Sequence, residues 1–521
     1  MKDTSDIMKE QVEDVRFLIS ASEAYPALER AFLDAQSQIT AGFRIFDLST
    51  KLRSDEARKI GDDWFDLVVY TLERGVSITF ILSDFDPVLA NELHATSWKS
   101  RRAFMAVREV AQGKYNLKVI NAAHPARVGL LPRMMLWPRL YARLKKLTND
   151  LNNSDRVERD HMFRLMPGIH RSVTQEGNGL LKAKRWPVPR LIPVTHHQKI
   201  ATFDDDLLYI GGLDLDERRY DDKGHHRRRD ETWHDIQMMC RGPVVKKAQT
   251  HLDEFLDVIA NHRTPSSGLS PIVRTLSAQR SFQQPFLSPK QVCHSIADRH
   301  MEAVQDARKL IYLETQFFRD RKLAKALAKQ AREKPDLSMI LVLPAAPEDV
   351  AFNNAHSADA RFGEYLQARC VKIVTDAFKD RILICSPVRP EKLHSDRRDT
   401  LNGSPIIYVH AKVSIFDDDL AMVSSANLNG RSMYWDTEAG VVLDDTDTVG
   451  HLRHRCFDHW LGQDADTEHH DLAKAVPRWT TTVQHNAQCD PDERQGFLVP
   501  YQPGPARKRG LFLPGISDAM V

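Results

Sequence analysis

One short pattern occurs twice in this sequence at a fixed separation, and it limits the possible folds more than any other feature. HQKIATFDDDLLYIGGLDLDER begins at His197 and HAKVSIFDDDLAMVSSANLNGR begins at His410, so the copies are offset by 410 − 197 = 213 positions without any insertion. Six pairs of positions keep this offset: His197 and His410, Lys199 and Lys412, Asp204 and Asp417, Gly212 and Ser425, Asp214 and Asn427, and Arg218 and Arg431. Repetition at one offset predicts that the chain contains two copies of one structural unit.

Each copy is preceded by the same alternation of helical and strand-like segments. These segments lie at 22–39, 43–48, 64–75 and 76–84 before the first copy, and at 295–309, 310–318, 321–334 and 337–345 before the second. Within each copy, the run DDD separates two strand-like stretches, which predicts a strand, a turn and a second strand. Alternating strands and helices are typical of α/β folds. We therefore predict an α/β protein with two tandem lobes, each a mixed β-sheet flanked by helices.

The repeat also suggests how the chain divides. RTPSSGLSP and SFQQPFLSPK have the composition of a linker, which places the boundary between the lobes near 265–290. We expect the following parts: a polar N-terminal segment at 1–20, a first lobe at 21–265 with a basic insertion at about 125–190, a second lobe at 285–465, and a C-terminal extension at 466–521.

Composition excludes several classes of protein. Lys and Arg number 73 against 71 Asp and Glu, a net charge of +2, so the whole chain is not a basic nucleic-acid binder. The six Cys form no C-x-x-C pair, so we expect neither a disulfide scaffold nor a structural zinc site. The first 15 residues lack the features of a secretory signal, and no apolar run is long enough to span a membrane. We expect a cytoplasmic or peripheral membrane protein, although export by a route without such a signal stays open.

The residue types in the repeated pattern suit chemistry on a phosphate group. Side chains at i and i+2 of a strand face the same side, so His197 points with Lys199, and His410 points with Lys412. Lysine supplies a charge for anionic oxygens, and histidine acts as a nucleophile or a general acid near neutral pH. Two such pairs facing each other can take separate catalytic roles, because one histidine can attack phosphorus while the other protonates the leaving oxygen.

The repeated pattern H-x-K-x4-D, followed by a pair of small residues, resembles the signature of the phospholipase D superfamily, with Ser424-Ser425 in place of the usual Gly-Ser. Further stretches are similar to eukaryotic-type phospholipases D: GGLDLDERRYD at 211–221, ETWHDIQMMCRGPVV at 231–245, IYLETQFF at 311–318 and FDHWLG at 457–462. The resemblance implies a single active site at the lobe interface and a phosphohistidine intermediate formed without metal or other cofactor.

The resemblance also implies a role for each candidate residue. His197 would be the nucleophile, and His410 the general acid and then the base. Lys199, Lys412 and Asn427 would hold the phosphoryl oxygens, and Asp214 would lie beside the strand that follows. The remaining candidates are supporting residues: Asp235 for His410, Glu438 for His197, Asp204 and Asp417 for the shape of the turns, and Gln316 and Glu314 for the lining of the site. A purely structural role for Glu314 is an equal alternative.

These residues predict a phospholipase D that releases phosphatidic acid and a head group from a glycerophospholipid such as phosphatidylcholine, with a water or alcohol acceptor. The alternatives are a cardiolipin synthase-like phosphatidyltransferase and a nuclease or tyrosyl-DNA-type phosphodiesterase, which share the same chemistry. We expect a monomer, because one chain carries both copies, and a phospholipid membrane surface rather than nucleic acid as the partner.

Three segments and a set of four histidines carry separate expectations. The basic and apolar stretch 130–147 fits either an anionic membrane interface or an amphipathic helix packed on its lobe, and Pro132 and Pro138 should break a helix near its start. Residues 225–230, HHRRRD, predict a solvated loop or a phosphate contact. Residues 503–510 predict an exposed tail unless the flanking apolar residues tie it back to the core. His451, His454, His469 and His470 show no metal-like spacing and are expected at the surface.

Overall fold

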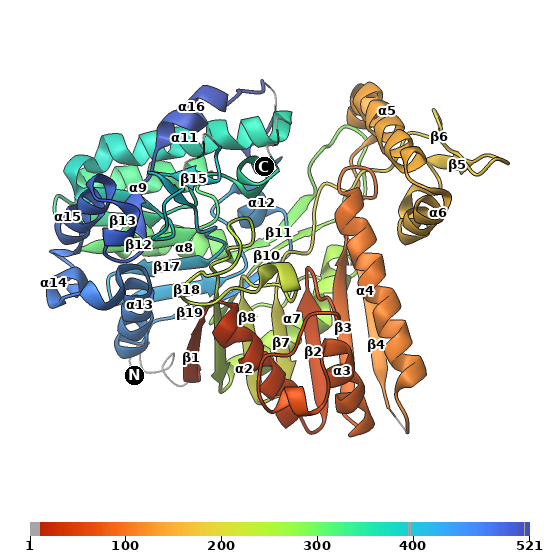
Figure 1. Cartoon of the computed structure of the whole chain (residues 1–521), viewed down its shortest axis with the longest axis horizontal. Coiled ribbons are helices and arrows are strands. Elements are labelled where there is room, and N and C mark those ends of the chain that lie inside the picture. The colour runs from red at the N-terminus through yellow and green to blue at the C-terminus, as the bar shows by residue number, and fades with distance from the viewer. Residues whose placement is uncertain are drawn as a thin grey trace.

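Two large β-sheets, one from each half of the chain, form the centre of the protein (Figure 1). The computed structural model describes residues 11–113, 115–353, 355, 357–393, 395, 397–514 and 516–520. The first sheet has seven strands in the order β1-β9-β8-β7-β2-β3-β4, and the second has nine in the order β11-β10-β19-β18-β17-β12-β13-β14-β20.

The strands of the first sheet are β1 (Glu13–Ile19), β2 (Gln38–Phe43), β3 (Ser77–Asp84), β4 (Leu117–Ala123), β7 (Ile200–Phe203), β8 (Leu207–Gly211) and β9 (Ile236–Arg241). Those of the second are β10 (Ile272–Ala278), β11 (Lys290–His294), β12 (Leu310–Thr315), β13 (Ser338–Val342), β14 (Ile382–Pro387), β17 (Lys412–Phe416), β18 (Leu420–Ser424), β19 (Glu438–Leu443) and β20 (Leu498–Pro500). Short two-stranded ribbons join β5 (Val173–Gln175) to β6 (Leu181–Ala183) and β15 (Thr400–Leu401) to β16 (Ser404–Pro405).

The two sheets repeat the same topology, strand for strand. The order β1-β9-β8-β7-β2-β3-β4 matches β10-β19-β18-β17-β12-β13-β14, and the second sheet adds only β11 and β20 at its edges. Strand directions match as well: β2, β3 and β4 run parallel, as do β12, β13 and β14, and the other matched neighbours are antiparallel. The predicted fold class, two tandem α/β lobes, is confirmed.

Helices pack beside both sheets (Figure 1). The longer ones are α2 (Ala21–Asp34), α3 (Trp64–Glu73), α4 (Asn91–Val110), α7 (Val244–Ile259), α8 (Ser295–Asp306), α9 (Arg321–Glu333), α11 (Ala358–Phe378), α13 (Thr446–Leu461) and α15 (Ala475–Gln488). The shorter ones are α10 (Glu348–Ala351), α12 (Gly430–Tyr434), α14 (Thr467–His470), α16 (Pro503–Arg509) and the 3₁₀ turns η1 (Ala57–Lys59), η2 (Pro167–Ile169), η3 (Glu217–Arg219), η4 (Lys379–Arg381), η5 (Gly462–Asp464), η6 (Pro491–Glu493) and η7 (Asp518–Met520). Asp63, Asp320 and Asp445 cap α3, α9 and α13, since their carboxylates accept backbone N–H groups of the first turn. In the described part of the chain, no helix combines the length and apolar character needed to cross a membrane.

One hydrophobic core joins the two lobes. It contains Ile210 and Met238 of the first sheet together with Val423 and Val441 of the second, all of them buried. Each such side chain contributes about 1.5–3 kcal/mol when it is fully buried. The lobes are therefore fixed against each other by the same kind of packing that stabilises each lobe internally.

The basic insertion forms a small unit of its own beside the first sheet (Figure 1). It contains α5 (Leu130–Asn153), α6 (Arg156–Leu165) and the β5–β6 ribbon, around a separate buried core with Leu140 and Leu144. The expected break near the start of the helix is wrong, because α5 is continuous through Pro138. Pro132 lies in the first turn, where the missing N–H costs nothing, and packing of the later turns outweighs the one hydrogen bond that Pro138 removes.

Three parts of the predicted division differ in the structure. β1 lies inside the segment expected to be a polar N-terminal arm, because Phe17 and Ile19 fill the core while only the first residues of the strand are polar. β10 lies inside the expected linker. Its apolar run is short and stands between Ser- and Pro-rich stretches, so the sequence did not indicate a strand there. The C-terminal extension is part of the second lobe: β20 pairs with β14, and Leu511, just past α16, donates to the Arg361 carbonyl of α11. Residues 503–510 are therefore helical and attached rather than an exposed tail.

Candidate functional site

Both repeated motifs form the predicted strand, turn and strand, as β7–β8 and β17–β18. Asp204 and Asp417 occupy equivalent turn positions with positive φ angles of 52° and 54°. Their carboxylates accept backbone N–H groups at the start of the neighbouring strand, with donors at 2.7–2.8 Å: Gln36, Ser37 and Gln38 for Asp204, and Arg308, Lys309 and Leu310 for Asp417. Neither aspartate lines the catalytic cavity, so their geometry fits the expected structural role.

The two motif histidines face each other across one cavity. The ring centroids of His197 and His410 are 6.5 Å apart, and both side chains line a cavity of about 580 Å³. His197 comes from the first lobe and His410 from the second. This arrangement leaves room for a single phosphoryl group between two imidazoles.

Each histidine is oriented by a carboxylate from the opposite lobe. His197 Nδ1 lies 3.1 Å from the Glu438 carboxylate and 3.1 Å from the Ser425 carbonyl oxygen. His410 Nδ1 lies 2.6 Å from Asp235 Oδ2. A carboxylate on Nδ1 leaves Nε2 of each ring available for chemistry. Asp235 and Glu438 thus occupy the positions that the resemblance implied.

The backbone repeats this exchange between lobes. His197 N donates to the Thr437 carbonyl at 2.9 Å, and His410 N donates to the His234 carbonyl at 2.7 Å. Residues 196 and 437 form one isolated parallel bridge, and residues 234 and 409 form the other. Each histidine is therefore held by main chain and side chain of the segment that precedes or begins β9 or β19 in the opposite lobe.

The two lysines lie beneath the histidines. Lys199 Nζ donates to the His197 carbonyl at 2.6 Å and is 3.9 Å from Asp214 Oδ2. Lys412 Nζ donates to the His410 carbonyl and is 2.7 Å from its Nδ1. Gln198, between His197 and Lys199, points away and accepts from His251 of α7, as the alternation of a strand predicts.

Burial suppresses charge throughout this cluster. Burial first, and the neighbouring lysines second, lower the pKa of His197 and His410 well below the usual value. Burial raises the pKa of Asp235 to about 6 and that of Glu438 to about 8, and it lowers the pKa of Lys412 to about 7. An entering phosphodiester anion would counter these shifts for the cationic groups, so the site is built to gain positive charge when its ligand arrives.

Two of the four remaining candidates line the cleft. Asn427 and Gln316 line it, and Gln316 donates to Tyr408 Oη at 2.8 Å. Asp214 accepts from Ile45 N and stands near Lys199. Glu314 does not line the cavity: its side chain is fully buried, accepts from Tyr312 and Trp460, and meets His234 at 2.5 Å. β12 turns this side chain toward the second-lobe core, which fits its structural alternative.

Four arginines line the cleft, and the sequence pointed to only one of them, Arg143, through the basic stretch 130–147. The four are Arg44, Arg143, Arg219 and Arg319. Arg44 follows β2 in a stretch expected to be a strand at 43–48, but β2 ends at Phe43 and the chain then leaves the sheet toward the cleft. Arg219 stacks on Trp233 at 3.7 Å and pairs with Glu348 at 3.2 Å. The only signal for it was its place in the RRYD stretch after the first motif.

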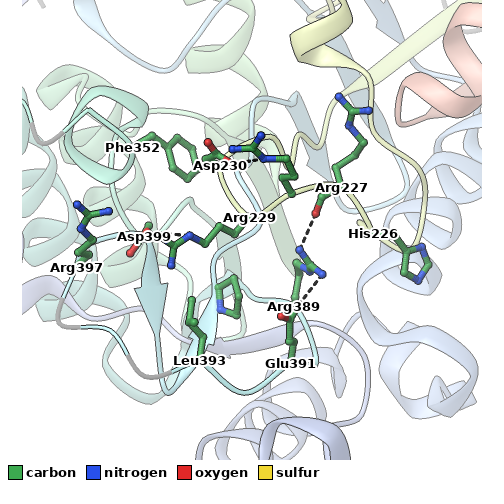
Figure 2. Close-up of a pocket in the computed structure, with 12 residues that line it drawn as sticks. His226, Arg227, Arg229, Asp230, Phe352, Arg389, Glu391, Leu393, Arg397 and Asp399 are labelled. Carbon is green, nitrogen blue, oxygen red and sulfur yellow. Dashed lines mark hydrogen bonds and ion pairs between the residues drawn. The ribbon is translucent and has the colours of Figure 1, made fainter.

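The loop 225–230 does not behave as one solvated segment. His225 is fully buried, as is His469, which was also expected at the surface. Arg227 and Arg229 line a second hollow of about 520 Å³ with Arg389 and Asp399, as Figure 2 shows. Arg389 donates to the Arg227 carbonyl at 2.7 Å, so side chains and carbonyls of both lobes close this hollow. Most of its charged groups are paired within it.

Comparison with known proteins agrees with this architecture. A family model described as "Cardiolipin synthase, PLD-like domain" matches residues 301–460. Phospholipase D1 of Saccharomyces cerevisiae is 22% identical over 378 residues, which cover 55% of this chain and 22% of that protein. Phospholipase D1 of Homo sapiens is 25% identical over 356 residues, covering 51% of this chain and 31% of that protein. These matches support membership of this chain in the phospholipase D superfamily.

A solved structure supports the fold along nearly the whole chain. The crystal structure of phosphatidylserine synthase from Haemophilus influenzae Rd KW20 superposes with a TM-score of 0.51 at 10% identity, covering 94% of this chain and 99% of that one. Phospholipase D alpha 1 of Cynara cardunculus is 22% identical over 357 residues, which cover 46% of this chain and 44% of that protein. The chain thus spans less than half the length of these curated phospholipase D relatives.

The Asp417 turn gives a stability prediction. Asp417→Ala leaves three backbone N–H groups, of which that of Leu310 is buried, without their charged acceptor, so the free energy of unfolding should fall by about 2–4 kcal/mol. Guanidinium denaturation followed by circular dichroism measures this. Asp419→Ala, two residues away in the same hairpin but exposed, is the matched control and should change stability by less than about 0.5 kcal/mol. Equal losses in both variants would contradict the structural role of Asp417.

Proposed function

We propose that this protein is a phospholipase D that cleaves the distal phosphodiester of a glycerophospholipid, such as phosphatidylcholine, to phosphatidic acid and a free head group. The observation that carries the proposal is the pair of opposed histidines, each with Nδ1 on a carboxylate of the other lobe and Nε2 free. The curated relatives named phospholipase D support the same assignment.

In the first step, His197 Nε2 attacks phosphorus and the bond to the head-group oxygen breaks. His410 gives its Nε2 proton to that oxygen, so the head group leaves with a neutral hydroxyl group rather than as an alkoxide. Lys199, Lys412 and Asn427 balance the charge of the phosphoryl oxygens. Glu438 accepts the hydrogen bond of His197 Nδ1, which stabilises the positive charge that develops on the ring.

In the second step, His410 acts as the base. It removes a proton from water, the resulting oxygen nucleophile attacks the phosphohistidine, and His197 leaves with its electron pair. The product is phosphatidic acid, and both histidines return to their starting states. A primary alcohol in place of water gives a phosphatidyl ester by the same path.

The charges of the cleft favour a lipid with a cationic head group over nucleic acid. Four arginines and four carboxylates line it, and the carboxylates are Glu92, Glu348, Asp349 and Asp359. A polyanion such as DNA needs a surface of predominantly positive charge, whereas one phosphate with a nearby ammonium group needs both signs. Burial first, and then Glu348 and Asp359, raise the pKa of Asp349, so a cation beside it would be stabilised.

The helix α5 is our candidate for contact with a bilayer. Its first two turns expose Leu131 (62%) and Met135 (84%), and Trp186 (60% exposed) stands beside Trp137 of the same helix. The following turns expose basic side chains, and Arg143 lines the catalytic cleft. Apolar residues followed by basic ones suit an anionic interface, and Arg143 links the basic turns to the cleft that must receive the lipid.

Replacing either motif histidine tests the assignment. His197→Ala and His410→Ala should each lower choline release from phosphatidylcholine vesicles by at least about 10³-fold, because each removes an essential participant in the chemistry. Choline release is measured by a coupled oxidase assay, with ethanol added in a parallel series to detect phosphatidylethanol. His226→Ala, an exposed histidine outside the cleft, is the control.

The same preparations should be assayed on plasmid DNA. Histidine-dependent cleavage of DNA without choline release would replace the phospholipase assignment by the nuclease alternative. Full activity of either alanine variant on phosphatidylcholine would refute the two-histidine scheme itself.

The Asp235–His410 pair predicts a pH dependence. Below its pKa of about 6, Asp235 becomes neutral and no longer stabilises a proton on His410, so kcat/KM should rise as the pH increases through about 6. Asp235→Asn should lower kcat/KM on the order of 10²-fold or more and remove this acidic limb from the profile. A variant that keeps the limb unchanged would show that another group produces it.

Membrane contact through α5 has its own test. The double variant Leu131→Asp and Met135→Asp should weaken binding to vesicles of phosphatidylcholine and phosphatidylglycerol by roughly tenfold or more, since two exposed apolar side chains no longer enter the interface. Sedimentation with vesicles measures the partition coefficient, and thermal unfolding verifies the fold. Val110→Asp, an exposed apolar position at the end of α4, is the matched control. Unchanged binding of the double variant would favour the alternative of a helix that only packs on its lobe.

A further inference from the structure

Three histidines from distant parts of the chain converge behind the catalytic cleft. His225 and His234 lie between η3 and β9, and His459 lies near the end of α13 in the other half. One ring nitrogen from each residue lies within 4.8 Å of those of the other two. His225 Nε2 and His459 Nε2 are 3.2 Å apart, close to the separation of about 3.3 Å between two imidazole nitrogens on one tetrahedral zinc ion.

We propose that His225, His234 and His459 bind a divalent first-row transition metal ion, with zinc as the best match to the ligands. Three imidazoles with a nearby carboxylate are a donor set that zinc accepts in four-coordinate sites. The imidazole rings also lie close together: their centroids are 5.3 Å apart for His225 and His459, 4.5 Å for His234 and His459, and 5.9 Å for His225 and His234.

Two buried carboxylates complete the arrangement. Asp221 Oδ2 accepts from His225 Nδ1 at 2.8 Å, which directs the Nε2 lone pair toward His459. Glu314 Oε1 lies 2.5 Å from His234 Nε2, and its other oxygen is held by Tyr312 and Trp460. Histidine ligands of a metal usually donate their second nitrogen to a carboxylate in this way. Glu314 can orient His234 or serve as the fourth ligand.

The nitrogens that face inward lack adequate partners from the protein. His234 Nδ1 is buried and has no hydrogen-bond partner among the described residues. His225 Nε2 and His459 Nε2 face only each other across the cluster. A buried polar atom without a partner costs about 1–3 kcal/mol, and an ion bound by all three rings would remove this cost.

The main chain of His234, rather than any imidazole of the cluster, connects the cluster to the catalytic pair. His234 directly precedes Asp235, its N donates to the Tyr408 carbonyl, and its carbonyl accepts from His410 N. His459 belongs to α13, so an ion would fasten the segment that carries Asp235 to the second lobe. We infer that the ion is structural, and that the mechanism proposed above proceeds on other residues.

Metal content of the full-length protein tests this inference directly. The protein is first incubated with zinc and then dialysed against metal-free buffer. Elemental mass spectrometry should then find about one equivalent of zinc per chain in the wild type. His459→Gln should lose at least about nine-tenths of it. His226→Gln is the matched control, because His226 neighbours His225 but is exposed and pairs only with Asp222, and it should retain the wild-type content.

A cobalt titration of the unaltered protein keeps the test independent of the variants' folding. Cobalt(II) bound by three imidazoles should give visible absorption that saturates at one equivalent and disappears when zinc is added. Absence of stoichiometric zinc and cobalt binding in the wild type would overturn the inference and leave the cluster as a hydrogen-bonded contact between lobes. Equal zinc in wild type and His459→Gln would also overturn it. None of these readouts depends on phospholipase activity, so failure here leaves the proposed function untouched.

Discussion

The exchange of carboxylates between the lobes is the constraint on which the rest of the structure depends. Glu438 of the second lobe holds His197 of the first, and Asp235 of the first holds His410 of the second. A histidine without its carboxylate partner lacks a fixed tautomer and orientation. Neither lobe can therefore form a working half-site alone, because each supplies the orienting group for the other.

Because each histidine depends on a carboxylate of the other lobe, the two lobes must be packed rigidly through a shared hydrophobic core rather than joined by a flexible hinge. Distances of about 3 Å between atoms of different lobes tolerate little relative motion. The backbone bridges at His196–Thr437 and His234–Val409 fix the register, and the shared apolar core below fixes the separation. A loosely attached pair of lobes would carry the same residues without holding them at reacting distance.

Much of this arrangement can be predicted from the sequence, because a motif repeated at one offset indicates a repeated structural unit. The offset of 213 positions predicted two equal lobes, and the H-x-K pattern predicted which side chains face together. The sequence did not predict the place of Arg44 in the cleft or the strand β10. Both depend on where the chain enters or leaves a sheet, and local sequence patterns do not determine those points. The cluster of His225, His234 and His459 was not predicted for a different reason: 234 positions separate His225 from His459, and only the packing of α13 against the first lobe brings them together. The predicted helix break at Pro138 was wrong because the packing of α5 outweighs the local penalty for proline in a helix.

The places where the two copies differ give the two histidines unequal surroundings. At the position of Ser425, whose hydroxyl donates to Glu438, the first copy has Gly212. A Cβ at Gly212 would lie 2.3 Å from Asp235 Oδ1, so glycine leaves the space that this carboxylate occupies.

The next matched pair, Asp214 and Asn427, adds a difference in charge. Asp214 places an anion 3.9 Å from Lys199. Asn427 adds no charge near Lys412 and leaves its buried Oδ1 without a hydrogen-bond partner in the described structure. The two lysines therefore meet an entering phosphoryl group beside different neighbours, a carboxylate next to Lys199 and a neutral amide in the matching position of the second copy. A nearly symmetric fold thus gives the two histidines unequal surroundings, as the proposed division between a nucleophile and a proton donor requires.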